Sequence, residues 1–260
     1  MTDLASRFVW YELMTTDTAS ARLFYGSVVG WGTRDASQPG MTYTLFTVGE
    51  SPVAGLMDLP EQARQMGSPP SWLGYISVAD VDAAAAKTAR LGGAVHVQPA
   101  DIPQVGRFAV VSDPQKCVIT LFSPLPMPSP PQDPAPGTPG YVGWHELCAT
   151  DWQKAFEFYG AMFGWQKGEP VDMGEMGIYQ LFTTAGGSMP IGGMFNKPPS
   201  MPMPFWLFYF NVDDIDAALT RVQSGGGKLL NGPMQVPGGD WIVQCLDPQG
   251  AMFALLGKRA

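Results

Sequence analysis

The stretch that decides the fold occurs twice in the chain. Residues 10–31 read WYELMTTDTASARLFYGSVVGW, residues 144–165 read WHELCATDWQKAFEFYGAMFGW, and 11 of the 22 aligned positions are identical. The same offset of 134 residues relates WLGYISVADVDAA at 72–84 to WLFYFNVDDIDAA at 206–218, and DPQ at 113–115 to DPQ at 247–249. This period is far longer than that of a solenoid repeat, so the chain is a tandem duplication in which each copy forms a domain.

A proline-rich segment separates the two copies. Residues 124–140 read PLPMPSPPQDPAPGTPG, with eight prolines in 17 positions. Such a composition favours an extended, semi-rigid connection and excludes a helix or a central strand. We therefore predict a first domain at 1–123, a linker at 124–140 and a second domain at 141–260.

Each copy has an internal rhythm of strands and helices. VWYELMT is a β-rich run, Asp17 is a typical N-cap for the helix that follows, and Gly30 is a typical helix end. Further strand-like runs are followed by WLGYISV, a helix capped by Asp80 or Asp82, and three more strand-like runs. The chain is thus predicted to be an α+β protein made of four βαβββ modules, two in each domain.

Composition and charge exclude several classes of protein. Of the 260 residues, 45% are hydrophobic and 15% are charged, which is typical of a globular protein and excludes a disordered chain. The net charge of -8 makes binding to nucleic acid or to an anionic membrane unfavourable. Three cysteines without a CxxC pair argue against a disulfide framework or structural zinc. Neither a signal peptide nor a membrane span is predicted, which favours a cytoplasmic protein. We expect a monomer or homodimer.

The repeated D-x(6)-FYG-x(3)-GW string, the closing DPQ strands and the paired modules resemble the vicinal oxygen chelate superfamily. That superfamily includes glyoxalase I, bleomycin-resistance proteins and extradiol dioxygenases, and the likeness is greatest to its tandem two-domain, glyoxalase-like bacterial members. The resemblance covers nearly the whole chain and implies cavities between paired modules. It is specific for the fold and only weakly specific for an activity.

Metal-dependent members of the superfamily hold a divalent ion through side chains from two facing modules. The resemblance places those ligands at positions that here carry no imidazole or carboxylate. These positions are Trp10, Gly55, Leu73, Thr120, Trp144, Gly193, Leu207 and Ala254. Because divalent ions in such sites need imidazole nitrogen or carboxylate oxygen, we predict no metal and no cofactor.

The two histidines do not rebuild a metal site. His96 follows a helix end, whereas His145 lies beside Trp144 and, by the period of a strand, points to the opposite face. We therefore expect a packed or surface role for both.

Two glutamates are the leading candidates for chemistry. Glu12 shares a strand face with Trp10 and Met14, and Glu146 shares the equivalent face with Trp144 and Cys148. A carboxylate on an apolar wall is desolvated and can act as a general base or bind a cationic or hydroxyl-bearing ligand. A structural role is the alternative, because a repeated glutamate can equally satisfy backbone N–H groups or anchor a neighbouring module.

Aromatic residues and methionines offer an apolar pocket lining or, alternatively, core packing. The candidates are Trp10, Tyr43, Met57, Trp72, Trp144, Tyr179, Met194 and Trp206. Phe24-Tyr25 and Phe158-Tyr159 lie on helices that must cover a sheet, which favours the core. Cys148 is a conceivable nucleophile, but the absence of a histidine beside it favours an unreactive buried thiol.

These observations predict two cavities that bind a small apolar or aromatic molecule without a metal. By the resemblance, one is lined by Trp10, Glu12 and Gly55 facing Leu207 and Ala254, and the other by Trp144, Glu146 and Gly193 facing Leu73 and Thr120. The alternative is a glyoxalase-like lyase, isomerase or oxygenase that uses Glu12 or Glu146 as base or an unrecognised metal site. A third possibility is a protein-interaction role.

Overall fold

The computed structural model describes residues 6–38, 40–126 and 134–259. The first copy has eight strands and three helices: β1 (Phe8–Thr15), α1 (Thr18–Val29), β2 (Gly32–Asp35), β3 (Tyr43–Val48), β4 (Ser51–Asp58), α2 (Glu61–Gln65), β5 (Ser71–Ser77), α3 (Val81–Arg90), β6 (Ala94–Ile102), β7 (Gly106–Ser112) and β8 (Val118–Pro124). Part of the predicted linker, residues 127–133, lies outside the described residues.

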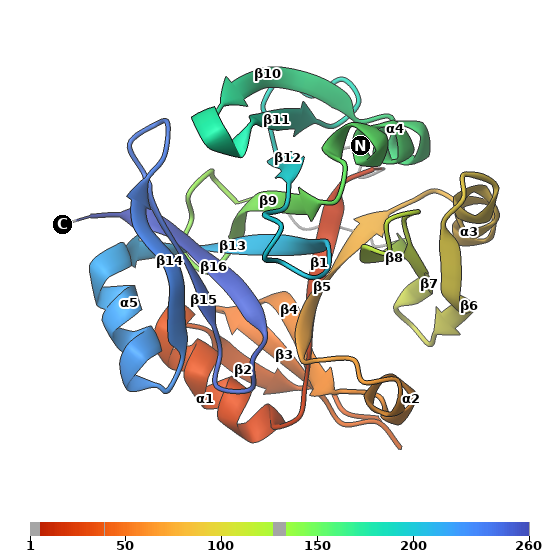
Figure 1. The fold of residues 1–260 in the computed structure, drawn as a ribbon. Helices are drawn as coiled ribbons and strands as arrows, with labels where there is room; N and C mark the ends of the chain where they lie inside the picture. The colour runs from red at the N-terminus through yellow and green to blue at the C-terminus, as the bar shows by residue number, and fades with distance from the viewer. Residues whose placement is uncertain (1–5, 39, 127–133, 260) are drawn as a thin grey trace. The chain divides into compact units, whose positions relative to one another are not determined.

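The second copy repeats the order of the first. Its elements are β9 (Val142–Ala149), α4 (Trp152–Phe163), β10 (Gln166–Asp172), the short 3-10 helix η1 (Gly174–Met176), β11 (Ile178–Thr183), β12 (Gly192–Asn196), β13 (Phe205–Asp214), α5 (Ile215–Ser224), β14 (Lys228–Gln235), β15 (Trp241–Leu246) and β16 (Met252–Lys258). Four βαβββ modules are therefore present in the described residues, and the predicted α+β class is confirmed (Figure 1).

Each copy forms one eight-stranded sheet. The strand orders are β2-β3-β4-β1-β5-β8-β7-β6 and β10-β11-β12-β9-β13-β16-β15-β14. Within a module the first strand pairs in parallel with the last, as β1 does with β4, and the remaining neighbours are antiparallel. The identical orders follow from the duplicated sequence.

Aspartates start the main helices as the sequence predicts. Asp17 accepts a hydrogen bond from the backbone N–H of Ser20 and begins α1, and Gly30 ends it with φ 85°. Of the two candidates before α3, Asp80 is the cap, since it accepts from the N–H of Ala83 and Asp82 lies within the first turn. The short helix α2 and the strand β2 were not predicted, because neither carries a clear hydrophobic period.

Contacts within the described residues divide the chain into two compact units. The first contains residues 6–9, 73–126 and 145–206, and the second contains 10–38, 40–72, 134–144 and 207–259. Each unit therefore combines one module from each copy. The predicted domain boundaries at 123 and 141 follow the sequence repeat, and they stay a prediction.

A buried hydrogen-bonded chain links the two modules of each unit. In the second unit the indole N–H of Trp72 donates to the hydroxyl of Tyr25 (2.9 Å), which donates to Asp247 (3.1 Å). The other oxygen of Asp247 accepts backbone N–H groups of the DPQ turn. In the first unit Trp206, Tyr159 and Asp113 repeat this chain. Each tyrosine is fully buried, so core packing, one of the two alternatives for Trp72 and Trp206, is the one that applies.

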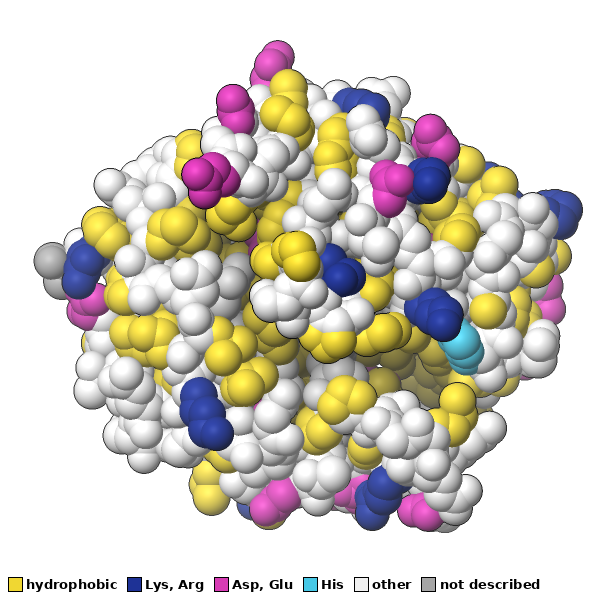
Figure 2. All heavy atoms as spheres, viewed as in Figure 1, with side chains coloured by type: hydrophobic (Ala, Val, Ile, Leu, Met, Phe, Trp, Pro, Cys, Tyr) yellow, Lys and Arg dark blue, Asp and Glu magenta, His cyan; other side chains and the backbone are white. Residues whose placement is uncertain are grey.

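The surface is sparsely charged. On the face drawn in Figure 2, the charged side chains stand as separate groups among uncharged and apolar atoms. In the described part of the chain, no helix is long and apolar enough to cross a membrane.

Replacing Tyr25 with Phe tests the buried chain. The change leaves the N–H of Trp72 without its acceptor and removes a donor from Asp247, and a buried group without a partner costs about 1 to 3 kcal/mol. We expect a clear loss of unfolding free energy in a denaturant titration. Tyr141→Phe is the matched control on a half-buried tyrosine. Equal stabilities of the two variants would contradict the role of Tyr25.

Candidate functional site

A hydrogen-bonded cluster lies on β1, β3 and β4 of the second unit. The indole N–H of Trp10 donates to the hydroxyl of Tyr43 (3.2 Å), and this hydroxyl donates to Oε2 of Glu12 (2.7 Å). Glu12 is only 7% exposed. The cluster therefore holds a buried carboxylate through a neutral donor in an aromatic surrounding.

Gly55 makes room for this cluster. It is the strand partner of both Glu12 and Leu45, so the three residues form one row across the sheet. A Cβ atom at position 55 would overlap the hydroxyl of Tyr43. The glycine at a position where the superfamily resemblance expects a metal ligand is thus required by the tyrosine that binds Glu12.

The first unit repeats the arrangement. The hydroxyl of Tyr179 donates to Oε2 of Glu146 (3.0 Å), and Glu146 is 6% exposed. Gly193 is the strand partner of Glu146, and a Cβ atom there would overlap the ring of Tyr179. Both copies have therefore kept the same glutamate, tyrosine and glycine.

The electrostatics keep the Tyr43 donor neutral. Burial and the nearby Glu12 raise the pKa of Tyr43 far above its ordinary value. Burial and Glu146 likewise raise the pKa of the Cys148 thiol far above its usual range. Cys148 is therefore an unreactive thiol at neutral pH, the alternative that the sequence favoured.

The structure brings several predicted site residues together. Met14 pairs with Met57, which also pairs with Tyr43, so these three form a second row beside that of Glu12 and Gly55. Trp10, Met14 and Met57 are half-buried, whereas Met194 is fully buried in the core.

The remaining predicted lining residues can be assigned to one or the other compact unit. Leu207 and Ala254 belong to the second unit with Glu12, and Leu73, Thr120, Cys148 and Gly193 belong to the first unit with Glu146. Trp144 ends a segment of the second unit, so this division assigns it to a different unit from Glu146. That these residues line two cavities stays a prediction.

The donor set of these clusters does not fit a divalent metal ion. Each offers one glutamate carboxyl group, already hydrogen-bonded to a tyrosine hydroxyl, and a glycine or tryptophan elsewhere. Across residues 6–38, 40–126 and 134–259 there is no group of three or more His, Cys, Asp or Glu side chains arranged to hold one.

The histidines have other contacts. The ring of His145 stacks on Phe8 with centroids 4.2 Å apart, and its Nδ1 lies 2.7 Å from the carbonyl oxygen of Ile191. Exposed His96 lies 2.9 Å from the hydroxyl of Ser112. The expectation of a packed or surface role holds for both histidines, because His145 is buried and His96 is exposed.

Comparison with protein families agrees with this fold. Residues 7–121 and 141–255 both match the model of the Glyoxalase/Bleomycin resistance protein/Dioxygenase superfamily. The chain belongs to this superfamily. The resemblance of the repeated FYG and DPQ motifs is thereby confirmed.

Two relatives from this superfamily match almost the full chain. The protein named "Putative glyoxylase CFP32" of Mycobacterium tuberculosis is 32% identical over 250 residues, which cover 95% of this chain and 93% of the relative. The anthracycline biosynthesis protein DnrV of Streptomyces peucetius is 30% identical over 261 residues, covering 96% and 92%.

Solved structures of the superfamily share the fold at low identity. The Mn(II)-bound glyoxalase from Novosphingobium aromaticivorans gives a TM-score of 0.64 at 16% identity, covering 99% of this chain and 83% of that one. Homoprotocatechuate 2,3-dioxygenase from Brevibacterium fuscum gives 0.67 at 14% identity, covering 98% and 81%.

Sequence reasoning missed the partners of the two glutamates. The sequence offers Tyr43 and Tyr179 only as apolar pocket lining or as core, because they lie 31 and 33 residues from the glutamates and the register between these strands does not follow from the sequence. The signal was present in the repeat, since glutamate, tyrosine and glycine recur together in both copies.

A Gly55→Ala variant tests the packing of the cluster. The added methyl group displaces Tyr43, and overpacking of this kind costs about 1 to 3 kcal/mol. We expect the cost to shrink when Tyr43 is also replaced by Ala, because the overlap disappears. A denaturant titration of the double-mutant cycle measures this, and additive costs would contradict the contact.

The pH dependence of stability tests the burial of His145. Burial lowers the pKa of His145 to about 4. The unfolded chain therefore takes up a proton that the folded one does not, and stability contributed by the neutral ring is complete above pH 6.5 and lost as the pH falls towards 4. The full effect is about 3 kcal/mol.

Comparing the wild type with His145→Gln isolates this effect. The variant should show a flatter fall of unfolding free energy between pH 6.5 and 4. Identical slopes for the two proteins would mean that His145 does not titrate differently on folding.

Proposed function

We propose that the protein binds a small apolar or aromatic molecule, without a metal ion, at the cluster of Trp10, Glu12 and Tyr43 and at its counterpart around Glu146. The observation that carries the proposal is the hydrogen-bonded Tyr43–Glu12 pair over Gly55, in place of the ligand set that metal-dependent relatives use. A neutral phenol and an indole bind by packing and hydrogen bonding rather than by coordination.

The wall beside Glu12 supports an aromatic ligand. Trp10, Met14 and Met57 are half-buried, so part of each side chain is accessible next to the carboxylate. Methionine and tryptophan together form an adaptable apolar surface. A carboxylate accepts up to about four hydrogen bonds, which suits a ligand that carries phenolic hydroxyl groups.

The relatives give a first ligand class to test. One relative is named for anthracycline biosynthesis, and anthracyclines are hydroxyl-bearing polycyclic aromatics. An anthracycline is therefore a suitable probe of a site built from an apolar wall and a buried acceptor.

A second candidate function is an enzyme that uses Glu12 or Glu146 as a general base. The observation that favours it is the deep burial of both carboxylates, 7% and 6% exposed, since a desolvated carboxylate is a stronger base. Such a protein would be a lyase, isomerase or oxygenase of the glyoxalase type.

Calorimetric titration with an anthracycline tests the proposal. We expect saturable binding with a Kd on the order of micromolar, unchanged after dialysis against a chelator. The double variant Trp10→Phe, Glu12→Gln should weaken binding at the Trp10–Glu12 cluster about tenfold or more. Trp152→Phe, on a half-buried tryptophan that contacts Lys167, is the control and should bind as the wild type does.

Replacing both glutamates separates the two candidate functions. A binding protein keeps its ligand chemically unchanged, whereas an enzyme converts it and loses turnover in the double variant Glu12→Gln, Glu146→Gln while still binding. Loss of binding on chelation would contradict the metal-free site.

A further inference from the structure

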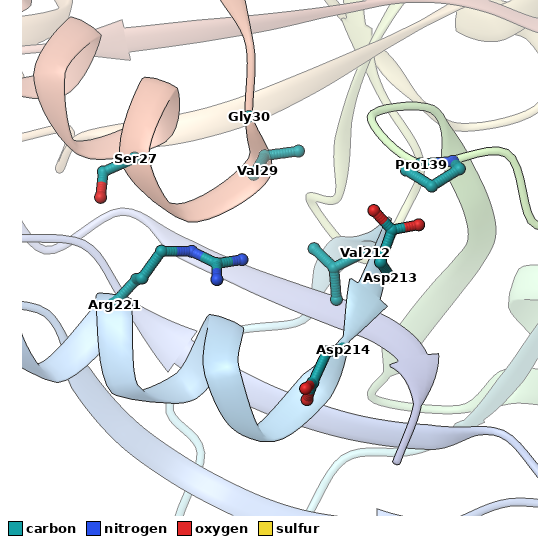
Figure 3. Close-up of a pocket in the computed structure, with 8 residues that line it drawn as sticks. All are labelled: Ser27, Val29, Gly30, Pro139, Val212, Asp213, Asp214 and Arg221. Carbon is teal, nitrogen blue, oxygen red and sulfur yellow. The ribbon is translucent and has the colours of Figure 1, made fainter. Parts of the chain in front are cut away.

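A pocket is lined by residues that do not belong to the glutamate clusters. In the second unit a cavity of about 370 Å³ opens where the C-terminal end of α1 meets β13, α5 and the end of the linker (Figure 3). Val29, Pro139 and Val212 give it apolar walls, and its charged lining residues are Asp213, Asp214 and Arg221. A volume of this size is at the lower end of the range of small-ligand sites.

The carboxylate of Asp213 and the guanidinium of Arg221 belong to different walls of the pocket. Figure 3 shows the guanidinium of Arg221 on α5 and the carboxylate of Asp213 near the end of β13, apart from one another. Among the described residues, no ion pair joins Arg221 to Asp213. Nη2 of Arg221 donates to the carbonyl oxygen of Val28 (3.1 Å), while its Nε is buried without a partner.

Comparing the two copies shows which charged residues of the pocket have a structural role in both. At the offset of 134, Lys87 corresponds to Arg221, and its Nζ lies 3.5 Å from the carbonyl oxygen of Met162 at the end of α4. Both units therefore have a cationic side chain at the C-terminal end of a helix, α1 in the second unit and α4 in the first, where it stabilises the helix end.

The acid is not common to both. Asp213 corresponds to Ala79, whereas its neighbour Asp214 corresponds to Asp80 and both of these cap helices. Helix capping thus explains Asp214 and the positive charge of Arg221 but not Asp213. The second unit alone combines the exposed carboxylate with the cation.

We propose that this pocket binds a small zwitterion, an apolar α-amino acid, with its carboxylate at Arg221 and its ammonium group at Asp213. Opposite charges held on separate walls match the two charged ends of such a molecule. The apolar walls of Val29, Pro139 and Val212 accept the side chain.

Calorimetry on the full chain with L-leucine tests this. We expect saturable binding with a Kd of about 1 mM or tighter. N-acetyl-L-leucine lacks the ammonium group and L-leucine amide lacks the carboxylate, so each should bind about tenfold more weakly or worse. No saturable binding of L-leucine, or equal binding of all three compounds, would overturn the proposal.

Three variants place the site. Asp213→Asn and Arg221→Gln should each weaken L-leucine binding about tenfold. Lys87→Gln is the matched control, because it removes the equivalent helix-end cation in the first unit and should leave binding unchanged. If Arg221→Gln is too unstable to titrate, Asp213→Asn on the exposed residue decides, and wild-type binding by that variant overturns the assignment.

Discussion

The fold depends on a buried hydrogen-bonded chain of Trp, Tyr and Asp that occurs once in each compact unit. A phenol with no exposed surface must have hydrogen-bond partners, and Tyr25 has one on each side, the indole of Trp72 and the carboxylate of Asp247. Burial raises the pKa of Asp247, yet its second oxygen still closes the DPQ turn. Because Tyr25 and Asp247 come from different copies of the repeat, these hydrogen bonds join a module of one copy to a module of the other.

The same framework leaves the row of Glu12 and Gly55 free to change its chemistry. The strands that carry this row are held by sheet pairing and by the aromatic core behind them. Trp10 and Tyr43 therefore occupy the space beside Gly55 without altering the fold. A shared fold does not by itself fix the chemistry of the site.

Sequence reasoning predicted what local rules decide. Asp17 and Gly30 bound α1 because capping depends on neighbouring residues only. The modules were also predictable, since the two copies can be aligned with each other and show the same order of strands and helices. The bond from Tyr43 to Glu12 escaped because it depends on strand register across 31 positions. The role of Trp72 escaped for the same reason, as its partner Tyr25 is 47 positions away.

The central claim is that a Trp–Tyr–Glu cluster stands where relatives hold a metal ion. Elemental analysis of the untagged protein, after incubation with manganese, nickel, iron and zinc salts and gel filtration, tests it most directly. The account predicts far less than one ion per chain, in the wild type and in Glu12→Gln alike. Near one ion per chain in the wild type, lost in Glu12→Gln, would contradict it.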